Sequence, residues 1–181
     1  MSRPDDRPLG AARLRLPVLV ASGLGSGFSR LAPGTVGSLA ALLPGILLSA
    51  HTGLLLLSIV VVCAAGLWAI PRASGGADHG WIVIDEVAGQ WITLLGLVSW
   101  HRHVPHDAAT AGLAGRLGWF LAAFLVFRLL DITKPSLIGV IDRRHDALGV
   151  MGDDVLAGLA GAMLLGLARL VLPAWAGCLA G

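Results

Sequence analysis

The chain has 181 residues and a formal net charge of +2, and only 13% of its residues are charged whereas 56% are hydrophobic. A soluble domain carries roughly 25% charged residues, so this composition favours an integral membrane protein of one domain. A soluble dimer with buried apolar helices remains the alternative. No basic stripe alternates with aromatic residues, so we expect no nucleic-acid partner.

The first 17 residues, MSRPDDRPLGAARLRLP, are polar and basic. They lack the long apolar core and the small-residue cleavage site of a secretory signal. We therefore expect a flexible cytoplasmic tail over residues 1–17 and a single membrane-embedded domain over residues 18–181.

Five apolar segments follow this tail, and several approach the ~20 residues that span a hydrocarbon core. They cover roughly residues 36–50, 53–70, 81–100, 113–130 and 155–172. The first is short enough to be tilted or half-inserted, and Pro71 and Pro173 are expected to end the second and the fifth. The sequence thus predicts an all-α fold, a polytopic membrane bundle of about five apolar helices.

The basic residues are distributed unevenly if these segments alternate in direction. Ten of the 13 then lie on one side, which makes that side cytoplasmic. These ten are Arg3, Arg7, Arg13, Arg15, Arg30, Arg72, Arg128, Lys134, Arg143 and Arg144, against Arg102, Arg116 and Arg169 on the other side.

Two adjacent acidic pairs stand out in this apolar chain, at the predicted starts of the third and fifth helices. They are Asp85-Glu86, in IVIDEVAGQWITLLGLV, and Asp153-Asp154, in GVMGDDVLAGLAGAMLLGL. Asp131 ends the fourth segment, so all five acids should meet at the cytoplasmic face. One acid per helix would serve as an N-cap, whereas a second adds repulsion that a cation relieves. Because Mg²⁺ prefers oxygen ligands, we predict that both pairs bind Mg²⁺ and that Asp131 completes a catalytic pocket.

Small residues follow each acidic pair at helical spacing. Gly89, Thr93 and Gly96 follow Asp85-Glu86, and Gly158 and Gly161 follow Asp153-Asp154. Such stripes allow two helices to approach closely in a membrane, which would bring their acidic ends together.

Phosphate-binding groups are predicted near the acids. Arg128 and Lys134, in FRLLDITKP, are candidate phosphate ligands, although an ion pair with Asp131 and a membrane anchor are the plainer interpretations. Two further acids of the same face are candidates: Asp78 for the metal and Asp142 for the substrate.

The glycine-rich segment GLGSGFSRLAPGTVGSLAALLP precedes the first apolar run. Free N–H groups at a helix start bind anions, so Gly34, Thr35 and Ser38 are candidate substrate ligands. An ordinary turn with a helix cap explains the same residues equally well.

Other chemistries find little support. No nucleophile elbow is visible, and the histidines His101, His103 and His106 lack a metal-ligand spacing. A small membrane transporter or cation channel could use the same acids, but it would need them near the bilayer midplane. The aspartate pattern of the CDP-alcohol phosphotransferases is absent.

Three blocks of the chain together resemble the phosphatidylglycerophosphatase A family. They are GLGSGFSRLAPGTVGSLAAL, DHGWIVIDEVAGQWITL and FRLLDITKPSLIGVIDRRHDALGVMGDDVLAG, at roughly residues 23–42, 78–95 and 127–158. The third block differs from the family pattern at Leu137, where a proline is usual, and at Asp146-Ala147, where a Gly-Gly pair is common.

The resemblance implies a Mg²⁺-dependent phosphatase of the bacterial inner membrane, multi-pass, with its active site facing the cytoplasm. Its substrate would be phosphatidylglycerophosphate in the bilayer, hydrolysed to phosphatidylglycerol and phosphate in phospholipid biosynthesis. The nucleophile, either a carboxylate or water, and the oligomeric state stay open.

Overall fold

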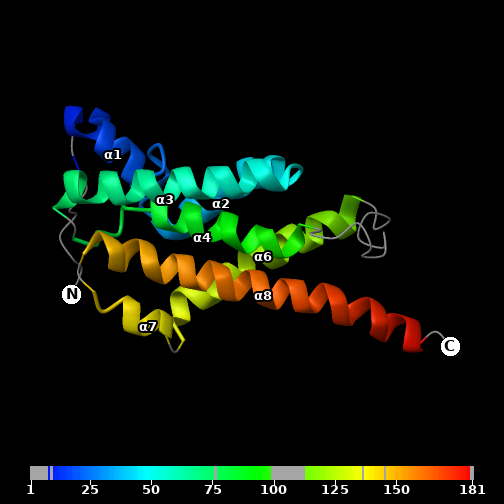
Figure 1. Cartoon of the computed structure of the whole chain (residues 1–181). Helices are drawn as coiled ribbons and strands as arrows, with labels where there is room; N and C mark the ends of the chain where they lie inside the picture. Colours follow the sequence, from blue (N-terminus) through cyan, green and yellow to red (C-terminus); the bar gives the residue numbers. More distant parts are fainter. Residues whose placement is uncertain are drawn as a thin grey trace.

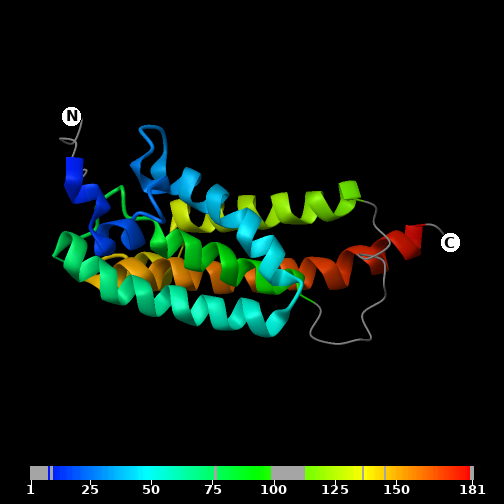
Figure 2. The same ribbon diagram turned by 90° about the horizontal axis from the view of Figure 1, so that it is seen from above.

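A computed structural model of the chain describes residue 8 and residues 10–75, 77–98, 113–135, 137–144 and 146–179, without the side chains of 113–116 and 172–179. Every regular element in these ranges is helical and none is a strand, which confirms the predicted all-α class. The helices run lengthwise in an elongated bundle (Figure 1, and from above in Figure 2).

Five long helices form the bundle: α2 (Pro33–Ser49), α3 (Thr52–Ser74), α4 (Ile84–Leu94), α6 (Leu113–Thr133) and α8 (Ala147–Leu179). Each of the five predicted apolar segments overlaps one of them, although every helix except α4 extends beyond the predicted bounds. Two short helices, α1 (Leu16–Ala21) and α7 (Leu137–Ile141), and 3-10 turns at Gly10–Leu14, Ser26–Phe28 and Leu95–Leu97 complete the described elements. The domain boundary predicted after residue 17 falls inside α1, and residues 1–7 lie outside the described part.

Two stretches are long and apolar enough to cross a membrane, judged by length and composition: α3 and the part of α8 over Ala147–Val171. A core helix of a soluble protein is mostly buried, whereas only 28% of an apolar 18-residue window in each stretch is buried within this bundle. Large apolar side chains such as Leu57 and Val60 on α3 and Leu167 and Leu170 on α8 are exposed. Both helices therefore present apolar faces outside the bundle.

α4 lies at the centre and packs most extensively against α8, and also against α2, α3 and α6. Glycines bring α4 and α8 into backbone contact. A Cβ atom added to Gly158 would lie 2.6 Å from the carbonyl oxygen of Gly89, and one added to Gly89 would lie 2.7 Å from that of Asp154. The small-residue stripes thus meet, as the sequence indicated, and they fix α8 beside the first turns of α4.

Proline does not end two helices where the sequence predicted it. α3 continues past Pro71 to Ser74 and ends at Gly75, which has a φ of 70° and donates its N–H to the Pro71 carbonyl at 3.0 Å. α8 likewise continues past Pro173. Proline removes one backbone donor and can kink a helix without terminating it. By contrast, α6 ends at Thr133, close to the predicted stop before Pro135.

The start of α8 also differs from the prediction. The helix begins at Ala147, about two turns before residue 155, and the Asp146 carboxylate accepts a hydrogen bond from the Gly149 N–H at 2.8 Å. Asp146 therefore caps this helix, and Asp153-Asp154 lie within it rather than at its start. The expectation that both acidic pairs begin helices holds only for Asp85-Glu86, in the first turn of α4.

Candidate active site

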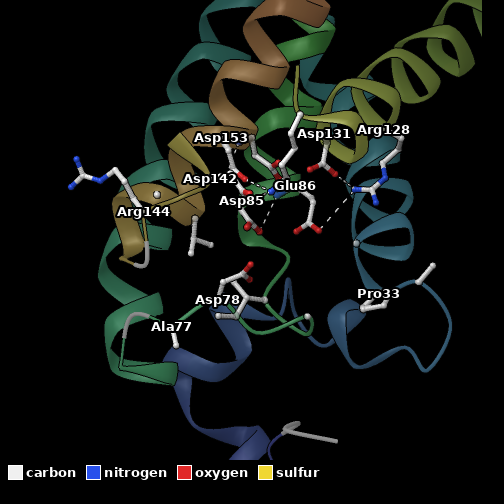
Figure 3. Close-up of a pocket in the computed structure, with 18 of the residues that line it drawn as sticks. Pro33, Ala77, Asp78, Asp85, Glu86, Arg128, Asp131, Asp142, Arg144 and Asp153 are labelled. Carbon is white, nitrogen blue, oxygen red and sulfur yellow. Dashed lines mark hydrogen bonds and ion pairs between the residues drawn. The ribbon is translucent and has the colours of Figure 1, made fainter. Parts of the chain in front are cut away.

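A cavity of about 750 Å³ lies at the end of the bundle where α4 and α8 begin and α6 ends (Figure 3). Three basic side chains line it: Arg128, Lys134 and Arg144. Seven acidic side chains line it as well, namely Asp78, Asp85, Glu86, Asp131, Asp142, Asp153 and Asp154. Acids therefore outnumber bases in this cavity, which makes it suitable for a cation.

Three of the carboxylates converge from two helices. Asp85 and Glu86 of α4 and Asp154 of α8 each offer an oxygen atom, and these three atoms lie within 4.8 Å of one another. Asp85 and Asp154 are buried, at 8% and 3% exposure, and Glu86 is half-buried. This carboxylate cluster (Asp85, Glu86 and Asp154) exists because the glycine contacts place α8 directly beside α4.

The adjacent Asp153 and Asp154 have different surroundings. Successive residues of an α-helix point about 100° apart, so the two carboxylates diverge. Asp153 accepts a hydrogen bond from the Lys134 ammonium at 2.6 Å and another from the Asp154 N–H at 2.9 Å. Oδ2 of Asp154, by contrast, is buried and has no hydrogen-bond partner among the described residues. Asp153, predicted as a metal ligand, thus lies outside the carboxylate cluster and pairs with a lysine.

Lys134 joins two elements of the site. It directly follows α6, has a left-handed backbone with a φ of 43°, and donates hydrogen bonds to Asp142 and Asp153. Partial burial alone would lower the pKa of Lys134, but these two hydrogen bonds outweigh it and raise the pKa above the ordinary lysine value. The ammonium group therefore stays charged at the wall of the cavity.

Arg128 of α6 also lines the cavity. Its guanidinium donates to Asp131 at 2.5 Å and lies 3.9 Å from Glu86, as the dashed lines in Figure 3 mark. It also donates to the hydroxyl of Ser38 on α2, at 3.4 Å. The i,i+3 ion pair with Asp131 is thus present, but the same guanidinium also faces the carboxylate cluster through Glu86.

Only some of the remaining predicted ligands line the cavity. Gly34 lines the cavity, whereas Thr35 and Ser38 do not, and Ser38 reaches the site only through Arg128. Asp78 lines the cavity from the connection between α3 and α4 and is exposed, outside the carboxylate cluster. Of the ten basic residues predicted on one side, Arg144 also lines the cavity, but Figure 3 shows its side chain pointing outward, and it pairs with Asp146.

The carboxylate cluster fits a divalent metal ion. Glu86 Oε2 and Asp154 Oδ2 are both buried and lack hydrogen-bond partners among the described residues. Leaving a buried carboxylate oxygen unpaired is costly, and a hard cation with oxygen ligands removes that cost. The donor set consists of oxygen atoms only, which suits Mg²⁺ better than a softer metal.

Comparison with known proteins agrees with this geometry. The family model of phosphatidylglycerophosphatase A matches residues 19–169, most of the chain. The chain belongs to the phosphatidylglycerophosphatase A family. This confirms the resemblance of the three sequence blocks and makes the chain an enzyme of a hydrolytic family, a phosphatase.

Individual relatives extend over nearly the whole chain. Phosphatidylglycerophosphatase A of Escherichia coli K12 is 35% identical over 173 residues, 90% of each protein. Its namesake in Haemophilus influenzae is 35% identical over 164 residues, 86% of this chain and 90% of that protein. A Bacteroides thetaiotaomicron protein named putative phosphatidylinositol-3-phosphatase is 38% identical over 169 residues, 87% of this chain and 96% of that protein. No solved structure matches the chain.

One buried polar residue near the site was missed by the sequence reasoning. Gln90 of α4 is 0% exposed, and neither of its amide atoms has a partner among the described residues. The signal in the sequence was an amide among the mostly apolar residues that follow Asp85-Glu86, four residues after Glu86.

Proposed function

We propose that the enzyme hydrolyses the terminal phosphomonoester of phosphatidylglycerophosphate and uses Mg²⁺ bound by Asp85, Glu86 and Asp154. Water adds across the P–O bond: its oxygen goes to phosphorus and a proton goes to the departing glycerol oxygen. The products are phosphatidylglycerol and inorganic phosphate, which would place the reaction in phospholipid biosynthesis. The observation that carries this proposal is the convergence of three carboxylates from two helices, beside two cations, in one cavity.

The residues around the carboxylate cluster have separate roles in this proposal. When bound, Mg²⁺ withdraws charge from the phosphoryl oxygens and so stabilises the transition state. Lys134 supplies a permanent positive charge for a phosphate oxygen, and Asp142 and Asp153 hold its ammonium group in place. The positive charge of Arg128 offsets the repulsion between the carboxylates of Glu86 and Asp131. Its guanidinium is the second cationic group beside the carboxylate cluster.

We further propose that the bundle lies in the bacterial inner membrane with the cavity at its cytoplasmic rim. The exposed apolar faces of α3 and α8 and the excess of basic residues on the cavity side support this orientation. In that position a lipid keeps its acyl chains in the bilayer while its phosphorylated headgroup enters the cavity.

The acids lie at helix ends or in the second turn of α8, not at the middle of broken helices. This arrangement, together with membership of a phosphatase family, favours hydrolysis over the transporter or channel that the acidic residues alone left open.

A second lipid substrate follows from the relatives. The Bacteroides thetaiotaomicron relative is named for phosphatidylinositol 3-phosphate, which also carries a phosphomonoester on a polyol headgroup. A phosphoinositide is therefore the second candidate, with the same cavity and the same chemistry.

The deciding experiment measures phosphate release by purified protein in mixed micelles that contain phosphatidylglycerophosphate or phosphatidylinositol 3-phosphate. Each lipid is supplied with Mg²⁺ or with excess EDTA. We expect release from phosphatidylglycerophosphate with Mg²⁺ and none with EDTA. Release from neither lipid would refute the proposed function, and faster release from the phosphoinositide would reassign the substrate.

Orientation has its own test. A cysteine introduced at Ala77, an exposed position on the cavity wall, is treated with a membrane-impermeant maleimide. The background is Cys63→Ser/Cys178→Ser. Labelling in inverted inner-membrane vesicles but not in intact spheroplasts is expected, and the reverse pattern would place the cavity on the outer side.

A further inference from the structure

Gln90 is a fully buried amide that hydrogen-bonds to none of the described residues. Its exposure is 0%, and both Oε1 and Nε2 lack partners. Buried polar groups in folded proteins are almost always paired, directly or through ordered water. The only other fully buried polar side chain of α4, Thr93, donates to the Gly89 carbonyl at 2.9 Å. Gln90 therefore needs a partner that its own helix does not supply.

The position of Gln90 follows from helix geometry. Residues four apart lie on the same face of an α-helix, so Gln90 lies one turn deeper than Glu86. That face of α4 meets α2 and α6. A Cβ atom on Gly34 of α2 would contact Glu86 and would lie 3.2 Å from Nη2 of Arg128 on α6. α2 runs alongside α4 at this depth, since the Trp91 indole N–H donates to the Ala41 carbonyl at 2.8 Å.

Two other polar atoms in the same region are buried and unpaired. Glu86 Oε2 is an acceptor without a donor, and Arg128 Nε is a donor without an acceptor. An amide group offers one of each: its N–H groups suit the carboxylate, and its carbonyl oxygen suits the guanidinium. Gln90 is thus chemically complementary to both orphaned atoms.

We propose that Gln90 is a positioning residue for the Glu86–Arg128 pair and acts through buried water beneath the cavity. Its amide N–H groups donate to a buried water that in turn donates to Glu86. Its carbonyl oxygen accepts a hydrogen bond from a buried water that accepts from Arg128. A buried water needs two to four polar partners, and these groups provide them. The inference rests on the proposed role of Glu86 as a metal ligand, because outer hydrogen bonds hold metal-binding carboxylates in place.

The test compares Gln90→Met with Gln90→Asn. Methionine nearly preserves the volume of glutamine but cannot bridge the two groups, whereas asparagine keeps the amide and loses volume. Thr93→Val is the matched control, since it removes another fully buried polar group of α4 but keeps the side-chain shape that packs beside Gly161 of α8. Binding of Mg²⁺ or Mn²⁺ is measured from the metal-dependent rise in unfolding temperature of purified protein, and initial rates are measured against metal concentration.

We expect Gln90→Met to raise the metal concentration for half-maximal effect about 10-fold or more in both measurements. Gln90→Asn should lie between Gln90→Met and the wild-type protein, and Thr93→Val should stay within about twofold of wild type. If Gln90 only packs, the methionine variant will bind metal at least as well as the asparagine variant, and this order would overturn the inference. A raised unfolding temperature for Gln90→Met with unchanged metal binding would overturn it as well.

The thermal measurement separates this inference from the proposed reaction. If wild-type protein binds metal but releases no phosphate from either lipid, the proposed function fails while the role of Gln90 is still decided by binding.

Discussion

Gly34 of α2 and Glu86 of α4 are in direct contact, because a Cβ atom on Gly34 would overlap Glu86 Oε1 and lie 3.2 Å from Arg128 Nη2. Gly34→Ala should therefore displace both side chains and lower kcat/KM roughly 100-fold, as small misplacements at a reacting centre do. The unfolding temperature should change little, because flexible side chains can move. Assays of phosphate release and thermal unfolding check this.

Gly118→Ala is the control for that variant, since a Cβ atom at Gly118 meets nothing within 4 Å. It should keep full activity and gain up to about 1 kcal/mol of helix stability. Equal activity of the two alanine variants would show that the Gly34 contact does not matter for catalysis.

Asp153 and Asp154 should respond differently to the same substitution. Asp154→Asn removes a member of the carboxylate cluster and should weaken metal binding by more than about 100-fold, the upper range for outer partners of a metal site. Asp153→Asn should leave metal binding near wild type and raise KM, because it frees Lys134. Metal titration and substrate titration of both variants distinguish these effects, and identical metal curves for the two would contradict the assignment.

Lys134→Gln should lower kcat/KM roughly 100-fold, the usual cost of removing one charge-stabilising donor. Lys134→Arg should recover part of this loss, since it keeps the charge. Because the pKa of Lys134 is raised, its ion pairs contribute fully to folding below the ordinary lysine pKa, ~10.4, and this contribution is lost only as pH rises through the higher folded value.

The pH–rate profile tests whether the pKa of Lys134 is raised rather than lowered. Any alkaline loss of wild-type activity below about pH 10 should persist in Lys134→Arg, since the lysine remains charged over that range. Disappearance of an alkaline limb in the arginine variant would show that Lys134 titrates there.

Gly158→Val should separate α4 from α8. Its Cβ atom would lie 2.6 Å from the carbonyl oxygen of Gly89 and 3.0 Å from Cβ of Ile92. Overpacking of this kind costs roughly 1–3 kcal/mol and should also abolish metal binding, because the same contact brings Asp154 to Asp85. Gly166→Ala, on the same helix with nothing within 4 Å, should be harmless in thermal unfolding and in activity.

The sequence predicted most of what depends on local pattern. Hydropathy located the five long helices, the three family blocks indicated the family, and the small-residue stripes predicted that α4 and α8 meet. These features are readable because each depends on residues close together in the chain.

Features that depend on helix phase and on packing between distant segments could not be read in this way. The start of α8 was misplaced because Asp153-Asp154 were interpreted as the first turn, whereas Asp146 is the cap. Asp153 and Asp154 have different partners because they point in different directions from α8. The link between Lys134, Asp142 and Asp153 appears only once α6, α7 and α8 are placed in space. The burial of the Gln90 amide likewise appears only once α4 is packed among its neighbouring helices.

The contact of α4 and α8 through glycine backbones affects how this protein can change over time. Main-chain atoms, not interdigitating side chains, set the spacing between Asp85 and Asp154. Leucines on the outer faces of α3 and α8 can then be exchanged for other apolar residues without moving the carboxylates, and in the proposed membrane position such exchanges would suit bilayers of different thickness. Variation of the outer apolar surface and preservation of the chemistry thereby fall on separate surfaces of the same helices.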